Sequence, residues 1–355
     1  ASVIADILYM ATLFAEKTPV MVNWTAGQAN LVASLDSVNT DCILTSKNLI
    51  ERLSSQGIIL DSISERFVYL EDIAKQISIF DKLKALVNSY INWSTLSKAR
   101  TIQTAVILFT SGSETYPKAV PLTHGYILND IKDAFELARI NSSDRFIGFL
   151  PPFHSFGLSI TTILPLCCGL QVVHHSNPTD SGTIAQLINK YKLTMLIGTP
   201  TFLDGVVNAS EPNQLNSLRL AVTGAEKCSE STYASIKQKC PDVIILEGYG
   251  ITECSPLVSV NPEYDARPFT IGKAIPSLEY KLLDPETMQP LNIPGKGILI
   301  VRGPTVFSGY LNYSEKSPFI VIDNKQWYNT GDIISIDDGG HFTFCGRVKR
   351  FVKIG

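Results

Sequence analysis

The stretch "LFTSGSETYPKAV" (Leu108–Val120) places a loop of hydroxyl residues and one glycine between an apolar run and a lysine. The loop residues concerned are Thr110, Ser111, Gly112 and Ser113. Hydroxyls and consecutive backbone N–H groups in such a turn form an anion-binding concavity, and the ammonium of Lys118 suits a phosphate as a point charge. The stretch therefore indicates a phosphate-binding loop after a buried strand, with a polar surface turn as the alternative.

Other short apolar runs alternate with longer amphipathic segments, a pattern typical of parallel strands covered by helices. The runs are "PVMVNW" (19–24), "DCILTS" (41–46), "RFVYLE" (66–71), "TAVILF" (104–109), "LTMLIG" (193–198), "LRLAVTG" (218–224) and "DVIILEG" (242–248). After them the strands become short and broken by Gly and Pro, which favours a small antiparallel barrel or sheet. We predict an α/β fold, with helix-covered parallel sheets over residues 1–262 and a β-barrel-like antiparallel subdomain over residues 263–345.

Composition excludes some classes of function. The 355 residues carry a net charge of -3, and no basic run is present that would follow a phosphate backbone, so we expect no nucleic-acid partner. Seven cysteines lack the C-x-x-C spacing of zinc or redox sites. We expect them to be buried thiols of a protein in the reducing cytoplasm.

Two apolar stretches resemble membrane segments. Residues 1–15, "ASVIADILYMATLFA", contain Asp6 and lack the features of a signal peptide, so we expect a buried helix. The stretch Phe156–Val173 is uncharged, but Pro165 and Gly169 interrupt it. A core helix followed by a strand is the favoured interpretation there over a membrane span.

A second polar motif, "GYGITE" (Gly248–Glu253), follows another predicted strand. It has only two glycines of a dinucleotide fingerprint and ends in a carboxylate that would repel a pyrophosphate. That carboxylate instead suits Mg2+ beside a triphosphate, because magnesium takes one or two protein oxygens and fills its octahedron with phosphate and water. Thr252 can donate to a phosphate, and Tyr249 offers a flat face to an aromatic base, with a turn and a packed aromatic as the alternative. Together the two motifs indicate an ATP site.

Two other classes of function remain open. A P-loop phosphotransferase is disfavoured because Pro117 and Ala119 stand where a Walker loop needs its second glycine and its magnesium-binding hydroxyl. A module that binds nucleotide without turnover is the other alternative.

Six motifs in order extend this interpretation. They are "TSGSETYPK" (110–118), "PPFHSFG" (151–157), "GAE" (224–226), "YGITE" (249–253), "WYNTGD" (327–332) and "GRVKRFVKIG" (346–355). The set resembles the AMP-forming adenylating enzymes: acyl-CoA synthetases, luciferases and peptide-synthetase adenylation domains. Within that superfamily, "LFTSGSE", "FHSFGL" and "EGYGITEC" look most like the acyl-acyl carrier protein synthetase part of bacterial 2-acylglycerophosphoethanolamine acyltransferase.

The resemblance implies a role for each matching residue. The residues implied at the ATP phosphates are Thr110, Ser111, Gly112, Ser113 and Lys118. The residues implied at the adenine are Gly224, Ala225, Glu226 and Tyr249. Thr252 would contact the α-phosphate and Glu253 the magnesium, while Asp332 and Arg347 would hold the ribose hydroxyls. His154 would lie near the acyl carboxylate, with a capped core histidine as the alternative.

The implied reaction converts a fatty acid and ATP into acyl-AMP and pyrophosphate, and then transfers the acyl group to a phosphopantetheine thiol. The acceptor would be acyl carrier protein, in a pathway of lysophospholipid reacylation, and a fatty or aromatic acid–CoA ligase is the alternative. Any association with the cytoplasmic face of the inner membrane would use regions outside this chain.

Some residues depart from the family pattern. Thr115 and Ala119 stand where the family loop usually has glycines, which predicts a stiffer phosphate loop. Residues 346–355 correspond to the hinge around Lys349 that precedes a C-terminal lid in the family. We therefore expect this chain alone to be poorly active.

Overall fold

The computed structural model describes residues 2–110, 116–314 and 317–348, and the chain divides into two compact units. The larger unit comprises residues 1–6, 122–309 and 315–355, and the smaller one comprises residues 7–121 and 310–314. The predicted phosphate-loop residues Ser111, Gly112 and Ser113 and the predicted hinge residue Lys349 lie outside the described residues. The predicted domain boundaries at 262 and 345 stay predictions.

The larger unit contains a seven-stranded sheet with the strand order β11-β10-β9-β8-β7-β5-β6. Its strands are β5 (Arg145–Gly148), β6 (Gln171–His174), β7 (Met195–Gly198), β8 (Leu220–Thr223), β9 (Ile244–Gly250), β10 (Leu257–Val260) and β11 (Lys273–Ala274). Strands β5 to β9 run parallel, whereas β10 and β11 are antiparallel to their neighbours. The carboxyl ends of β8 and β9 therefore meet at one edge of the sheet, where ligands gather in such folds.

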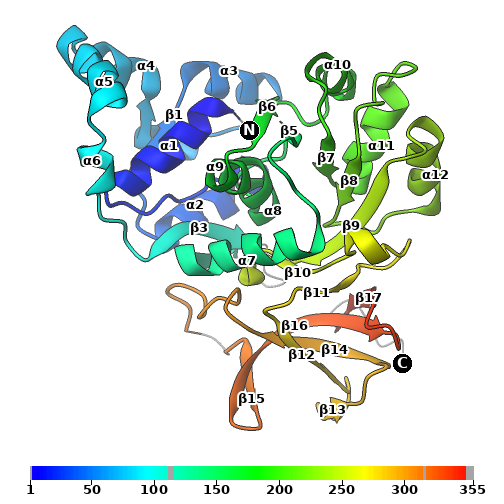
Figure 1. Cartoon of the computed structure of the whole chain (residues 1–355). Coiled ribbons are helices and arrows are strands. Elements are labelled where there is room, and N and C mark those ends of the chain that lie inside the picture. The colour runs from blue at the N-terminus through cyan, green and yellow to red at the C-terminus, as the bar shows by residue number, and fades with distance from the viewer. Residues whose placement is uncertain (1, 111–115, 315–316, 349–355) are drawn as a thin grey trace. The chain divides into compact units, whose positions relative to one another are not determined.

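Three helices lie beside β7, β8 and β9 (Figure 1). They are α10 (Ser181–Tyr191), α11 (Pro200–Ala209) and α12 (Glu230–Lys239). Each begins where a capping side chain accepts a hydrogen bond from the backbone of its first turn, and the caps are Asp180, Thr199 and Ser229. Their apolar faces bury residues such as Ile184, Leu203 and Ile236 against the sheet in one hydrophobic core.

The stretch Phe156–Val173 is a helix followed by a strand, as predicted. It comprises α8 (Ser155–Leu158), a π-helical turn (Ser159–Ile163), α9 (Leu164–Cys168) and β6. Gly169, at a φ of 65° in the left-handed region, ends the helix. Within the described ranges, no helix combines the length and the apolar character that crossing a membrane requires.

A six-stranded antiparallel sheet completes the larger unit and confirms the predicted fold class. Its strands are β12 (Glu279–Leu283), β13 (Pro290–Leu291), β14 (Gly295–Arg302), β15 (Phe319–Ile322), β16 (Lys325–Ile336) and β17 (Phe342–Arg347). The order is β13-β12-β14-β16-β15, with β17 also paired to β16. Hydrogen bonds from Phe342 N to Gly272 O at 2.7 Å and from Ile271 N to Phe342 O at 2.8 Å join this sheet to the loop before β11.

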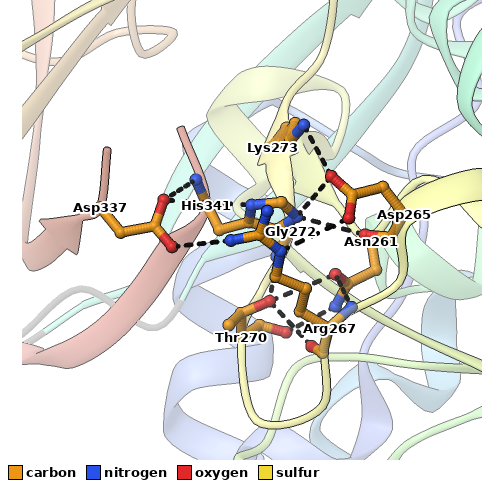
Figure 2. Close-up of polar contacts among 8 residues, drawn as sticks. All are labelled: Asn261, Asp265, Arg267, Thr270, Gly272, Lys273, Asp337 and His341. Carbon is orange, nitrogen blue, oxygen red and sulfur yellow. Dashed lines mark hydrogen bonds and ion pairs between the residues drawn. The ribbon is translucent and has the colours of Figure 1, made fainter. Parts of the chain in front are cut away.

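A polar network beside these hydrogen bonds strengthens the join (Figure 2). The imidazole of His341 is buried and bonds through Nε2 to the carbonyl oxygen of Asp265 at 3.2 Å. Arg267 contacts Asp337 at 3.2 Å, and Lys273 contacts Asp265 at 2.9 Å. The exposed ion pairs add little energy individually, but with the buried histidine they fix the loop before β11 against the β16–β17 hairpin.

The smaller unit is helix-rich. Its elements are α2 (Gln28–Ser37), β1 (Ile43–Thr45), α3 (Lys47–Ser55), β2 (Phe67–Tyr69), α4 (Leu70–Gln76), α5 (Ile79–Ile91), α6 (Ser94–Ser97) and β3 (Thr104–Thr110). The strands β1 and β2 are parallel, and residues such as Leu35 and Ile63 form a core beside them. Helix α1 (Val3–Phe14) and strand β4 (Lys118–Thr123) each contain residues of both units. Helix α7 (His124–Leu137), which follows β4, belongs to the larger unit.

Three sequence expectations are wrong or incomplete. The run "PVMVNW" contains no strand, because the side chain of Asn23 accepts from Thr25 N and starts a 3-10 turn at Trp24–Ala26. Only Val20 forms an isolated bridge, with Ile107. Residues 3–14 are helical as predicted, but only Tyr9 and Leu13 of that helix are buried. The cysteines are all free, yet three are exposed: Cys42, Cys167 and Cys345.

Candidate functional site

Two predicted site residues, Tyr249 and Arg347, meet at the carboxylate of a third, Asp332, which is fully buried. Tyr249, near the end of β9, donates its hydroxyl to Asp332 Oδ2 at 2.5 Å. Arg347, at the end of β17, donates Nε to Asp332 Oδ1 at 2.5 Å and Nη2 to Oδ2 at 3.4 Å. Asp332 and Arg347 are register partners on β16 and β17. The two sheets of the larger unit thus bring residues 83 positions apart into contact.

The backbone around Asp332 is held by its own "NTGD" turn. Asp332 N donates to Thr330 Oγ1 at 3.0 Å, and Thr330 Oγ1 donates to Leu299 O at 2.8 Å. Gly331 N donates to Asn329 Oδ1 at 2.9 Å, and Gly331 adopts a φ of 69°, in the left-handed region that favours glycine. The carboxylate is therefore positioned before any ligand binds.

The surroundings of Tyr249 and Arg347 keep these two groups in defined charge states. Burial raises the pKa of Tyr249 well above its usual value, and the Asp332 carboxylate raises it further. The hydrogen bond to Asp332 raises the pKa of Arg347. The phenol is thus a neutral donor and the guanidinium a permanent cation. The ring of Phe344 lies 6.0 Å from the ring of Tyr249 and adds a second aromatic face, which the sequence analysis did not identify.

Thr252 and Glu253 lie in a short 3-10 turn, Thr252–Cys254, directly after β9. Gly250 allows this turn because a Cβ there would lie 2.3 Å from Pro256 O. The side chain of Glu253 is buried, and its backbone carbonyl accepts from Phe307 N at 2.9 Å. After the dominant bond to Asp332, the charge of Glu253 also contributes to the raised pKa of Arg347. Glu253 therefore shares the electrostatic environment of the Asp332 cluster.

A hydroxyl that the sequence analysis missed lies beside Thr252. Ser155 Oγ is buried at the start of α8 and lies 3.2 Å from Thr252 Oγ1. Its neighbour His154 is exposed, and its ring packs on Phe153 with the centroids 4.7 Å apart. Desolvation by the surrounding chain lowers the pKa of His154. The alternative of a core histidine is wrong, and the only sequence signal for Ser155 was its place in the "PPFHSFG" motif.

The "GAE" motif follows β8 and lies next to β9. A Cβ on Gly224 would lie 3.0 Å from Gly248 O, so the small residue permits close approach of the two strand ends. Ala225 is exposed at a φ of 67°. Glu226 accepts a hydrogen bond from Thr201 Oγ1 of α11 at 2.6 Å. The motif thus presents backbone near the start of the "YGITE" segment, and its contact with adenine stays a prediction.

The described phosphate-loop residues, Thr110 and Lys118, belong to the smaller unit. Thr110 ends β3 and Lys118 begins β4. The ammonium of Lys118 lies 4.4 Å from the ring centroid of Tyr313 and 5.1 Å from that of Tyr310. These cation–π contacts hold the lysine in a fixed place within its unit. No motif in the sequence indicated either tyrosine.

Magnesium needs oxygen ligands in an octahedral arrangement. Across the residues with described positions, no group of three or more His, Cys, Asp and Glu side chains is arranged to hold a metal ion. In the turn after β9, the larger unit instead offers one buried carboxylate, that of Glu253, with the hydroxyl of Thr252 adjacent to it in sequence. This set fits Mg2+ bound mainly by phosphate and water, because magnesium rarely uses an all-protein cage.

Comparison with known proteins provides a context for these residues. The family described as "AMP-binding enzyme" matches residues 5–311. Luciferin 4-monooxygenase of Nipponoluciola cruciata is 30% identical over 268 residues, which are 74% of this chain and 48% of that protein. A long-chain-fatty-acid–CoA ligase of Salmonella typhimurium is 31% identical over 257 residues, which are 70% of this chain and 45% of that protein. The chain spans about half the length of these curated relatives.

Solved structures show the same fold. A long-chain-fatty-acid–CoA ligase from Archaeoglobus fulgidus aligns with a TM-score of 0.80 at 22% identity, covering 98% of this chain and 70% of that one. The O-succinylbenzoate coenzyme A synthetase of Bacillus subtilis, in complex with ATP and magnesium ion, aligns with a TM-score of 0.75 at 19% identity, covering 99% of this chain and 69% of that one. At these identities the likeness establishes the fold alone.

Proposed function

The chain belongs to the AMP-binding enzyme family, and from this premise we propose that it takes part in ATP-dependent activation of a carboxylic acid as an acyl-adenylate. The observation that carries the proposal is the buried carboxylate of Asp332, fixed by Tyr249 and Arg347 and close to the Glu253 charge. The carboxylate has about four acceptor positions, and Tyr249 and Arg347 use three of them, so it suits a ligand that presents a hydroxyl to the remaining position on Oδ1. A ribose is such a ligand.

In the proposed reaction, a carboxylate oxygen of the acid attacks the α-phosphorus of ATP. The bond from that phosphorus to the bridging oxygen of pyrophosphate breaks, and pyrophosphate leaves with the electron pair. A thiolate then attacks the acyl carbon and AMP leaves, so a thioester forms. Two anions must approach in the first half-reaction, and positioning and charge neutralisation therefore supply most of the assistance.

We assign the residues of this chain as follows. Asp332 and Arg347 hold the ribose, while Tyr249 and the backbone of Gly224, Ala225 and Glu226 border the adenine. Thr252 donates to the α-phosphate. Thr110, Ser111, Gly112, Ser113 and Lys118 bind the phosphates, and His154 borders the acyl carboxylate.

Glu253 would hold Mg2+, which neutralises phosphate charge when bound. The support for ATP and magnesium is that a structural relative was solved with both. A carboxylate oxygen is also one of the protein ligands that magnesium takes while phosphate and water fill the rest of its octahedron.

The proposed acid is a fatty acid, because relatives named as long-chain-fatty-acid–CoA ligases match this chain in sequence. For the thiol acceptor we propose acyl carrier protein, on the motif resemblance around residues 108–114, 153–158 and 247–254, with a role in lysophospholipid reacylation in the cytoplasm. CoA is the alternative, which the names of the relatives support.

The test starts with binding of AMP to the 355-residue chain by calorimetry, comparing wild type with Asp332→Ala. Turnover is then assayed with a ladder of fatty acids, ATP and either holo-acyl carrier protein or CoA, measuring pyrophosphate, AMP and thioester. We expect AMP and pyrophosphate as products. Formation of ADP, or AMP binding that does not depend on Asp332, would overturn the proposal.

A further inference from the structure

Helix α5 (Ile79–Ile91) of the smaller unit has an apolar face that none of the elements described in the structure covers. None of its residues is buried, although seven of its thirteen residues are large and apolar. The exposed apolar residues are Ile79, Phe80, Leu83, Leu86, Val87, Tyr90 and Ile91. Single exposed apolar residues need no explanation, but a contiguous exposed stripe marks an interaction surface. Trp93, which follows the helix in the sequence, is also 60% exposed.

The helix is formed by local signals, despite its lack of packing. Ser78 caps it by accepting from Asp81 N at 3.1 Å, and Asn92 N bonds back to Asn88 O at 2.9 Å. The segment lies between α4 and α6 (Figure 1). A capped helix with a free apolar face is ready to bind without first folding, so little ordering entropy opposes its binding.

The charges of α5 are arranged around the apolar stripe. At about 3.6 residues per turn, the seven apolar residues occupy one arc, and Lys82 and Lys84 lie at its two edges. Asp81, Asn88 and Ser89 occupy the opposite face. Lysines at the edges of an apolar arc can bury their methylene stems and keep their ammonium groups in the headgroup layer.

The wider segment is basic in an acidic chain. Residues 77–100 contain four basic residues and one acidic residue, whereas the whole chain has a net charge of -3. The basic residues are Lys82, Lys84, Lys98 and Arg100. None of the four forms an ion pair with any residue whose position the structure describes. This local excess of positive charge complements a surface of opposite sign.

We propose that α5 is a membrane-surface helix that inserts its apolar face into a bilayer bearing anionic headgroups. Its thirteen residues give a length of about 20 Å, shorter than the hydrocarbon core of about 30 Å, so the helix lies in the interface and does not span it. The combination of Phe, Tyr and Trp with flanking lysines is typical of interfacial helices. A second copy of the chain is a poorer occupant, because pairing two α5 helices would bring two basic segments together.

The proposal is tested by flotation of the 355-residue chain with vesicles of phosphatidylcholine alone and of phosphatidylcholine with phosphatidylglycerol. We expect flotation with the anionic vesicles and much less with the neutral ones. The double variant Leu83→Gln with Val87→Gln should reduce the partition coefficient at least about tenfold, since it removes apolar area that drives insertion. The control Asn88→Gln with Ser89→Gln changes the polar face with residues of the same kind and should bind like wild type.

A second pair of measurements separates electrostatics from insertion. Lys82→Gln with Lys84→Gln should weaken binding to anionic vesicles about 30-fold, from about one kcal/mol for each basic residue near the surface. Emission of Trp93 should shift to shorter wavelength with anionic vesicles, and Trp93→Phe should abolish that shift. Circular dichroism of each variant verifies that the fold persists.

Two results would overturn the proposal. One is wild-type chain that stays unbound to anionic vesicles. The other is a Leu83→Gln, Val87→Gln variant that floats as well as wild type. Sedimentation velocity distinguishes a self-association surface: a wild-type dimer that this variant converts to monomer, with no vesicle binding by either, would assign α5 to a second copy of the chain.

Discussion

Tyr249 donates its hydroxyl hydrogen to Asp332 across the two sheets of the larger unit, at 2.5 Å. The shorter hydrogen bond from Arg347 goes to the other carboxylate oxygen, Oδ1. Two carboxylate oxygens offer about four acceptor positions, and Tyr249 and Arg347 use three of them. The cluster therefore retains one position, on Oδ1, for a ligand hydroxyl while remaining fixed without it. The relationship couples the end of a parallel strand, where nucleotides bind in α/β folds, to a strand of the antiparallel sheet.

Tyr249→Phe should lower the free energy of unfolding by about 1.5 kcal/mol, because a hydrogen bond to a charged, buried acceptor is lost. AMP affinity should fall about tenfold, because Asp332 loses one of the hydrogen bonds that fix the orientation of its carboxylate. Urea unfolding and calorimetry measure the two effects. Tyr280→Phe is the matched control, since the structure gives its hydroxyl no partner among the described residues; equal effects of both variants would contradict the role assigned to the Tyr249 hydroxyl.

Asp332→Ala should weaken AMP and ATP binding by the same factor, because AMP and ATP present the same ribose hydroxyls to this carboxylate. Calorimetry with each nucleotide tests this. Asp338→Ala, in the exposed turn a few residues away, should leave both affinities unchanged. A variant at Asp332 that keeps normal AMP binding while it loses ATP would place this carboxylate at the phosphates or the metal.

Glu253→Gln should reduce affinity for ATP with magnesium far more than affinity for AMP without magnesium. The amide keeps the shape of the side chain and removes the charge that a divalent cation needs. We expect the difference to be at least about tenfold, a loss that even outer-sphere partners of metal sites commonly cause. Equal losses of affinity for the two nucleotides, measured by calorimetry, would show that Glu253 does not bind the metal.

Gly272→Ala should destabilise the larger unit strongly. Gly272 has a φ of 74°, and a Cβ there would lie 2.0 Å from Asn261 N and from the carbonyl carbon of Val260. Gly340→Ala is the control, because Gly340 has a similar φ of 76° with nothing within 4 Å of its Cβ. The control should cost about 1 to 2 kcal/mol from the left-handed conformation alone, and Gly272→Ala clearly more in urea unfolding. Similar losses of stability in the two variants would show that the contacts between the loop before β11 and the β16–β17 hairpin (Figure 2) relax without cost.

The parts of the site that follow a strand were predictable from the sequence. Tyr249, Thr252 and Glu253 come directly after an apolar run, and polar residues after a parallel strand gather at one edge of the sheet. Their local pattern predicted a strand that ends two residues before the observed end of β9 at Gly250, and the chemistry assigned to the turn after it stays a prediction.

The contact between Tyr249 and Asp332 was not predictable in this way. It depends on the register of β16 against β17 and on the packing of one sheet on the other, which no local pattern encodes. Asp332 and Arg347 entered the prediction only through resemblance to a family. Ser155 was missed because a serine at the start of a helix is far more often a cap than a partner of a distant threonine.

The last prediction concerns Asp130, a carboxyl group buried in α7. Asp130 accepts a hydrogen bond from Leu257 N at 2.9 Å. Burial raises the pKa of Asp130 well above its usual value, the bond from Leu257 opposes this rise, and the charge of the nearby Asp133 adds to it. In the unfolded chain this carboxyl ionises near pH 4, at about 3.9, whereas the folded chain keeps the proton to higher pH.

Between those two pKa values the folded state binds more protons than the unfolded state, so the free energy of unfolding falls as pH rises, by up to about 1.4 kcal/mol per pH unit. Asp130→Asn keeps an oxygen to accept from Leu257 N and removes the titration. The variant should therefore gain stability relative to wild type as pH rises from about 4 toward 7, as measured by urea unfolding at several pH values. A constant difference between the two proteins over this range would show that the pKa of Asp130 is not raised in the folded chain.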